Sequence, residues 1–224
     1  MEITRLTPDT YPRWEHFRHF FDECACAVSL CDDIDVTDLR RACHDTGTSF
    51  YIAMLWCVTK TVNAHDEFRM TTVETAEDPY PIPAVFDEIS PAHNVFHEDS
   101  ETYTTLFTPW KRDYECRDFG TFADNCAADM ARAKRLRVMS IPCPENTFEA
   151  SCVPWRHFTS VGVTCEAYPL TPIIAWGGFT EQNGRTKMPL SIQIHHAAAD
   201  GFHLARFLNE TEAAALELAE TIYN

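Results

Sequence analysis

The spacing of apolar residues predicts where the helices lie. An almost continuous apolar run over residues 49–63 predicts a helix that is buried on most of its sides. The helix before it should be capped by Asp35 or Thr37 and run to about residue 46, because Gly47 favours a helix stop. The remaining helices are expected at residues 13–21, at residues 113–134 and after Asp200-Gly201, the last with an apolar stripe of Ala205, Leu208, Ala215, Leu218 and Ile222.

A second set of segments has the pattern of β-strands. Strand-like runs cover residues 26–30, 148–153, 159–166, 172–179 and 188–196, and shorter runs broken by prolines lie between residues 70 and 108. The pair Asn183-Gly184 is typical of a tight hairpin turn. Alternation in the last run places every second residue from Leu190 to His196 on one face of its strand.

These elements predict a mixed α/β fold with a mainly antiparallel sheet covered by helices. Helices and strands do not alternate regularly, so a doubly wound nucleotide-binding fold is not expected. Neither G-x-G-x-x-G nor a phosphate-binding P-loop is present. With 224 residues and 45% hydrophobic content, the chain suits one compact domain spanning residues 1–224.

The net charge of the chain limits the kinds of partner that it is expected to bind. The chain has 18 Lys plus Arg against 34 Asp plus Glu, a formal net charge of −16. This balance argues against binding to nucleic acid and against docking on an anionic membrane. No apolar run approaches the roughly 20 residues of a membrane-spanning helix. The residues Met1–Arg5 lack the basic stretch and apolar block of a signal peptide, so a cytoplasmic location is expected.

The ten cysteines are expected to be small buried side chains. Disulfides are not expected in a reducing cytosol, and the one close pair, Cys24 and Cys26, lacks the spacing of a zinc site. A metal site or a single reactive thiol remains an alternative. The cysteines are Cys24, Cys26, Cys31, Cys43, Cys57, Cys116, Cys126, Cys143, Cys152 and Cys165.

The block from His195 to Gly201 (HHAAADG) is the strongest candidate for chemistry. It lies where a predicted strand ends and a helix begins, and its alanines allow close approach to an imidazole. Asp200 can cap the helix, and an imidazole is suited to proton transfer near neutral pH. A catalytic His196 and a purely structural role both remain open. A metal site made by His195, His196 and Asp200 is less favoured, because adjacent strand residues point to opposite faces.

Several segments carry a resemblance to a known family. The stretch from Met188 to Asn209, MPLSIQIHHAAADGFHLARFLN, closely resembles the active-site signature of the chloramphenicol acetyltransferases, whose wider CoA-dependent acyltransferase superfamily shares H-H-x-x-x-D-G. Other segments are similar to that family in the same order along the chain: Arg13-Trp-Glu-His-Phe17, Asn63-Ala-His-Asp-Glu-Phe-Arg-Met70, Val95-Phe-His-Glu98, Glu101-Thr-Tyr103 and Ser151-Cys-Val-Pro-Trp155.

The resemblance implies a role for each site residue. His196, the second histidine of the pair, would be the general base that removes a proton from the acceptor hydroxyl. The Ser151 hydroxyl would donate to the oxyanion of the intermediate and would not be a nucleophile, since acetyl passes directly between two bound substrates. Asp200 would pair with Arg13 and hold the loop that orients His196. A helix-capping aspartate with a solvated arginine is the plainer alternative.

The resemblance also implies partners. Acetyl-CoA would be the co-substrate, Tyr51 and Trp155 would lie near its tunnel, and no metal is expected. Because family members are trimers with the active site between subunits, a homotrimer is expected, in which His196 of one chain faces Ser151 of its neighbour. The acceptor pocket would be lined by His19, Phe20, Cys24, Cys26, Asn94, Tyr103, Val138, Val161 and Val163.

The sequence departs from the family at several of these positions. Ala175 replaces a threonine that supports the intermediate, and Ser49 replaces a basic residue available to CoA. Arg185 or Lys187 would then have to attract anionic CoA. Several phenylalanines and leucines of the acceptor pocket become valine or cysteine. Three functions are therefore considered: an O-acetyltransferase acting on chloramphenicol and conferring resistance, one acting on another hydroxyl compound, and a non-catalytic binding relative.

Overall fold

The computed structural model describes residues 2–76, 80–110, 118–164 and 169–223. The helices are α1 (Trp14–Arg18), the π-helix η1 (His19–Glu23), α2 (Thr37–Thr46), α3 (Phe50–Asn63), the 3-10 helix η2 (Asp66–Phe68), α4 (Phe119–Leu136) and α5 (Gly201–Ile222). The strands are β1 (Ile3–Arg5), β2 (Ala27–Asp35), β3 (Met70–Val73), β4 (Ile82–Phe86), β5 (Ser90–His97), β6 (Thr102–Phe107), β7 (Thr147–Val153), β8 (Ile173–Gly177), β9 (Thr180–Gln182) and β10 (Arg185–His195).

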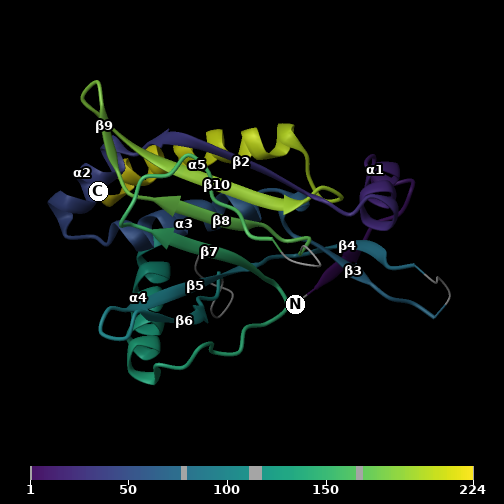
Figure 1. Ribbon diagram of the computed structural model, residues 1–224, viewed down its shortest axis with the longest axis horizontal. Helices are drawn as coiled ribbons and strands as arrows, with labels where there is room; N and C mark the ends of the chain where they lie inside the picture. The colour runs from purple at the N-terminus through teal and green to yellow at the C-terminus, as the bar shows by residue number, and fades with distance from the viewer. Residues whose placement is uncertain (1, 77–79, 111–117, 165–168, 224) are drawn as a thin grey trace.

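The strands form two sheets. The larger has seven strands in the order β2-β10-β8-β7-β5-β6, with β9 paired to β10, and the smaller has the order β1-β4-β3. Among the described strand pairs of the larger sheet, β5 with β7 and β7 with β8 are parallel and the others are antiparallel. This arrangement confirms the prediction of a mixed, mainly antiparallel α/β fold. Figure 1 shows α1 at one end of the molecule and α2 and α4 at the other.

The two faces of the larger sheet have different surroundings. Helices α2 to α5 pack on its inner face, where Ile192, Phe148 and Leu55 belong to one continuous core. The outer face is the opposite side, which carries Ser191, Ala175 and Ser151 side by side on β10, β8 and β7. None of the helices in the described ranges is long and apolar enough to cross a membrane.

Individual polar residues and glycines lie at the ends of several predicted elements. The N-cap position of α2 is Val36, which makes no side-chain cap, and Asp35 lies one residue earlier. The Asp35 carboxylate accepts hydrogen bonds from the backbone N–H of Thr37 at 3.0 Å and from its hydroxyl at 2.7 Å. Gly47 ends α2 with a φ of 73°. Asn183 and Gly184, with φ of 52° and 75°, make the left-handed turn between β9 and β10. The predictions for Gly47 and for Asn183-Gly184 are confirmed, whereas the prediction of Asp35 or Thr37 as the cap of α2 is wrong, because Val36 occupies that position.

The strand expected at residues 159–166 is wrong over the part that is described, residues 159–164, which form no regular element. Side chains of β10 satisfy the backbone there instead of a neighbouring strand. Gln193 accepts from the Val163 N–H at 2.9 Å and donates to the Val163 carbonyl at 2.7 Å, and Ser191 donates to the Val161 carbonyl at 3.3 Å. The segment therefore crosses the outer face instead of extending the sheet.

Three helix predictions need adjustment. The expected helix at residues 13–21 is α1 followed by the π-helix η1, because the wider turn continues to Glu23. The long helix begins at Phe119, and residues 113–117 of the prediction lie outside the described residues. Ala205 was expected on the buried stripe of α5 but is exposed. The buried side of α5 is instead made by Leu204, Phe207, Leu208, Thr211, Ala214, Ala215, Leu218 and Ala219.

Candidate active site

His196 follows the last residue of β10 and is held by the N-terminal part of the chain. Its backbone N–H donates to the Cys26 carbonyl at 2.8 Å, just before β2 begins. Its ring stacks on Phe20 of η1, with ring centroids 3.8 Å apart and an interplanar angle of 18°. The residue is half-buried, so the imidazole is packed on one side and accessible on the other. The ring is not enclosed in a dry interior.

The hydrogen bond of Nδ1 determines which nitrogen of His196 is available. Nδ1 lies 2.9 Å from the Ala199 carbonyl oxygen, which can only accept, so Nδ1 must donate. In the neutral ring the proton is therefore on Nδ1, and Nε2 keeps its lone pair. The close approach to the carbonyl is possible because Ala197, Ala198 and Ala199 are all fully buried and small.

The loop after His196 is secured by Asp200 and Arg13. Arg13 Nη1 donates to Asp200 Oδ2 at 2.5 Å, and Asp200 Oδ1 accepts from the backbone N–H of Phe202 at 3.1 Å. Asp200 thus makes the ion pair and caps α5 at the same time, and Arg13 is paired and not the solvated arginine of the plainer alternative. Burial, the largest single influence, would raise the pKa of Asp200, but the hydrogen bonds and positive charge of Arg13 and His203 together outweigh it and lower the pKa.

His203 is a contributor that the sequence analysis did not single out. Its Nδ1 lies 3.2 Å from the backbone nitrogen of Asp200, which completes a capping box at the start of α5. The position, three residues after the cap, is the usual one for this motif, but Glu or Gln normally occupies it. The spacing could have identified His203, whereas its residue type obscured it.

The geometry does not support the alternative of a metal site made by His195, His196 and Asp200. His195 is buried on the outer side of β10, where its Nδ1 accepts from the Ala197 N–H at 3.1 Å. Burial lowers the pKa of His195, and the neighbouring His196 lowers it further. Within the described ranges no three His, Cys, Asp or Glu side chains gather as a metal site.

Ser151 lies on the outer face, far from His196 of the same chain. The sheet register aligns Ser151 with Ala175, and Ala175 with Ser191. Ser191 lies five residues before His196, so strand geometry separates Ser151 from His196 by roughly 15–20 Å. One chain therefore does not bring the two predicted catalytic residues together.

The predicted acceptor residues divide into two groups in the same way. Phe20 and Cys26 contact His196, and His19 and Cys24 lie next to them, where the Cys24 N–H donates to the His19 carbonyl at 2.9 Å. The second group lies on or beside the outer face with Ser151. It comprises Asn94, Tyr103, Val138, Val161 and Val163, and all but the half-buried Asn94 are exposed in the single chain.

The two residues predicted near CoA differ in their surroundings. Trp155 is 65% exposed and packs edge-on against Phe96, with ring centroids 4.8 Å apart. Tyr51 is engaged internally, because its hydroxyl lies 3.0 Å from His93 Nδ1 and burial raises its pKa. Burial also lowers the pKa of His93 to about 3, so this histidine is a neutral structural residue.

The positions named as departures have specific structural roles. Ser49 caps α3, where its hydroxyl accepts from the Ile52 N–H at 3.5 Å. Arg185 donates to Asp35 at 2.7 Å and Lys187 lies 3.5 Å from the same carboxylate, so both predicted CoA-attracting cations are engaged in internal ion pairs. Ala175 lies directly between Ser151 and Ser191 on the outer face.

The expectation that the cysteines are buried is correct for only part of the set. Cys43, Cys57 and Cys126 are buried, whereas Cys24 and Cys143 are exposed. The rest of the described set, Cys26, Cys31 and Cys152, is partly buried, and Cys116 and Cys165 lie outside the described residues. Every cysteine in the described ranges is a free thiol. Burial raises the pKa of Cys152 to about 12, so this thiol next to Ser151 is not an activated nucleophile.

Comparison with known proteins identifies a matching family model and relatives of this chain. A family model described as chloramphenicol acetyltransferase matches residues 1–212. A chloramphenicol acetyltransferase from Streptomyces acrimycini is 37% identical over 211 residues, covering 91% of this chain and 90% of that protein. One from Campylobacter coli is 34% identical over 216 residues, covering 95% of this chain and 98% of that protein.

A solved structure shares the fold. A protein described as chloramphenicol acetyltransferase superposes with a TM-score of 0.77 at 22% sequence identity, covering 95% of this chain and 99% of that one. The larger sheet with helices on its inner face is thus a known arrangement, and nearly the full described chain takes part in it.

Proposed function

This chain belongs to the chloramphenicol acetyltransferase family, and from this premise we propose that it transfers acetyl from acetyl-CoA to a hydroxyl of chloramphenicol. Family membership makes the chain an acyltransferase, so the non-catalytic alternative is not retained. A single catalytic domain is supported by the continuous core, which joins residues from Phe17 to Ala219. We also expect a cytoplasmic location, where acetyl-CoA is available.

In the proposed mechanism His196 is the general base. Its Nε2 accepts the proton of the acceptor hydroxyl as that oxygen attacks the thioester carbonyl. The Ser151 hydroxyl donates to the oxyanion of the tetrahedral intermediate. When the intermediate collapses, the carbon–sulfur bond breaks and the imidazolium returns its proton to the leaving thiolate. The Nδ1 hydrogen bond to the Ala199 carbonyl supports this role, because it leaves Nε2 as the nitrogen that can accept a proton.

We further propose that the working enzyme is a homotrimer with its active site between subunits. The separation of Ser151 and His196 within one chain supports this, since a second copy must bring one of them to the other. Exposed aromatic residues on the outer-face side, Tyr103 at 50% and Trp155 at 65%, are also typical of a surface that a neighbour covers.

The observation that carries the proposal is the His196 imidazole, fixed by Ala199 and Phe20 with Nε2 free to react. The test is a thiol-release assay with the purified protein, acetyl-CoA and chloramphenicol. We expect turnover that requires both substrates and is lost in His196→Ala. Thiol release no faster than in that variant would reject the proposal.

A second candidate function is acetylation of a different hydroxyl compound. It is favoured by the small side chains Val138, Val161 and Val163 on the acceptor side, which leave a roomier wall than large aromatic residues would. Efficient turnover of chloramphenicol at micromolar concentration would count against this candidate.

A further inference from the structure

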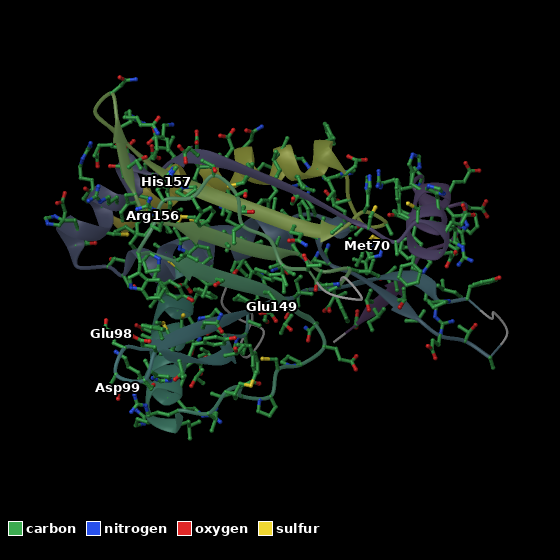
Figure 2. All side chains as sticks on the ribbon, viewed as in Figure 1. Met70, Glu98, Asp99, Glu149, Arg156 and His157 are labelled. Atoms are coloured by element: carbon green, nitrogen blue, oxygen red, sulfur yellow. The ribbon has the colours of Figure 1, made fainter. Side chains whose placement is uncertain are left out.

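The outer face of β7 carries a carboxylate close to Ser151 to which no role has been assigned. Alternation along β7 buries Phe148 and Ala150 on the inner face and places Glu149 on the same face as Ser151. Two strand residues separate their Cα atoms by about 7 Å. Figure 2 shows Glu149 over the middle of the molecule, well away from Glu98 at one edge.

The strands on either side give Glu149 a mostly apolar setting. Its partners in the sheet register are Ala92 on β5 and Ile173 on β8. Asn94, two residues beyond Ala92, accepts from the Thr105 hydroxyl through Oδ1 at 2.8 Å. These described neighbours on β5 and β8 offer Glu149 no positive charge, and the face combines a carboxylate, a serine hydroxyl and an amide.

The Glu149 carboxylate has no partner of its own. Across the described parts of the chain, no hydrogen bond or ion pair engages it, although the protein has 18 Lys plus Arg. Glu149 is exposed in the single chain, and partial desolvation by its surroundings nevertheless raises the pKa of its carboxyl. An unpaired carboxylate in such a setting favours a cationic group placed against it.

We propose that Glu149 determines acceptor specificity by binding a cationic ammonium group of a hydroxyl acceptor whose reacting oxygen lies near Ser151. The inference rests on the proposed function, because it uses the outer face as the acceptor site. It names the substrate class as amino alcohols in which the ammonium lies within a few bonds of the hydroxyl. A neutral acceptor such as chloramphenicol would meet the same carboxylate without a compensating charge.

The experiment compares two acceptors with the same carbon skeleton. The first is chloramphenicol. The second is its deacylated aminodiol with the nitrogen dimethylated, which is a protonated ammonium at neutral pH and cannot form an amide. For the full-length enzyme, kcat/KM is measured for both compounds by thiol release, and the O-acetyl products are identified by mass spectrometry.

We expect Glu149→Gln to lower the ratio of kcat/KM for the ammonium compound to that for chloramphenicol by about tenfold. Glu149→Asp, which keeps the charge, should retain most of the wild-type ratio. The matched control Glu98→Gln removes an exposed carboxylate from the turn between β5 and β6, and should leave the ratio unchanged.

The possible failures are distinguishable. If the wild type acetylates chloramphenicol but Glu149→Gln changes both acceptors by the same factor, this inference is wrong and the proposed function stands. If the wild type acetylates chloramphenicol and does not use the ammonium compound, the inference is also wrong. If neither compound releases thiol above the His196→Ala background, the proposed function itself fails, and the inference fails with it.

Discussion

At the scale of single residues, the notable feature of His196 is that three separate parts of the chain hold it. The Cys26 carbonyl fixes its backbone, the Phe20 ring fixes its plane, and the Ala199 carbonyl fixes its proton. In the proposed mechanism, an imidazole held in this way needs no rearrangement before it accepts a proton. Such preorganisation is the arrangement that general-base catalysis requires.

Removing the imidazole should therefore abolish catalysis without unfolding the protein. We expect His196→Ala to lower kcat by about 10²–10⁴-fold. Steady-state kinetics of the wild type and the variant, with a thermal melt of the variant, provide the measurement. A folded variant that retains wild-type kcat would contradict the role of base.

Residue-scale prediction from the sequence succeeded where a local pattern was specific. The HHAAADG block identified His196 and Asp200, and the resemblance supplied the pairing of Asp200 with Arg13, 187 residues away. The Phe20 stack was not predicted, because a π-helix turn brings that ring over the imidazole and spacing does not reveal such a turn. Glu149 could have been found, since strand alternation already placed it on the Ser151 face.

At the scale of elements, the junction between β10 and α5 depends on one side chain with two functions. Asp200 caps the helix and receives Arg13 from the residue before α1, so the first and last helices are tied at the same point. The capping part was predictable from Asp-Gly before a helical stripe. The ion pair was not predictable from local patterns, because its partners are distant in sequence.

Replacing Asp200 or Arg13 should destabilise the junction between β10 and α5. The losses in free energy of unfolding of the two single variants should not sum to the loss in the double variant. We expect Asp200→Ala and Arg13→Ala each to lower the free energy of unfolding by about 1–3 kcal/mol, the aspartate more because its cap is lost as well. For a chain of this size, that is a fall in Tm of roughly 2–10 °C. Thermal melts of the two single variants and the double variant give the coupling energy, expected to be about 1 kcal/mol. A strictly additive double variant would show that the pair contributes no energy.

The error at residues 159–164 has an instructive cause. The local composition of this segment suits a strand, but its backbone partners are the side chains of Gln193 and Ser191. A sequence pattern indicates whether a segment can adopt an extended conformation. It does not indicate whether a neighbouring strand has an unpaired edge with which that segment can form hydrogen bonds. The amide of Gln193 imitates a neighbouring strand, and a glutamine inside an apolar run gave no sign of this.

At the scale of the whole molecule, the separation of His196 and Ser151 has a testable consequence. If the site forms between copies, a subunit lacking His196 and a subunit lacking Ser151 can complement each other. We expect His196→Ala and Ser151→Ala to be strongly impaired alone, and their refolded mixture to recover up to about a quarter of wild-type activity.

The measurement is thiol release after the two variants are unfolded together and refolded. A mixture of the variants refolded separately is the matched control and should show no recovery. If the jointly refolded mixture has only the mean activity of the two variants, each site lies within one chain and the intersubunit arrangement is wrong. Sedimentation of the wild type reports the number of copies directly.

The position of β10 in the larger sheet has a consequence for how the protein is made. This strand pairs with β2, β8 and β9, and among the strands of the described ranges β2 pairs with β10 alone. During translation, β2 therefore cannot pair with β10 in the larger sheet until residue 195 has left the ribosome. At about 5–20 residues per second, this leaves β2 unpaired for roughly ten seconds or more. We expect the nascent chain to engage chaperones during that interval, and prematurely terminated products to be degraded instead of accumulating as partial enzymes.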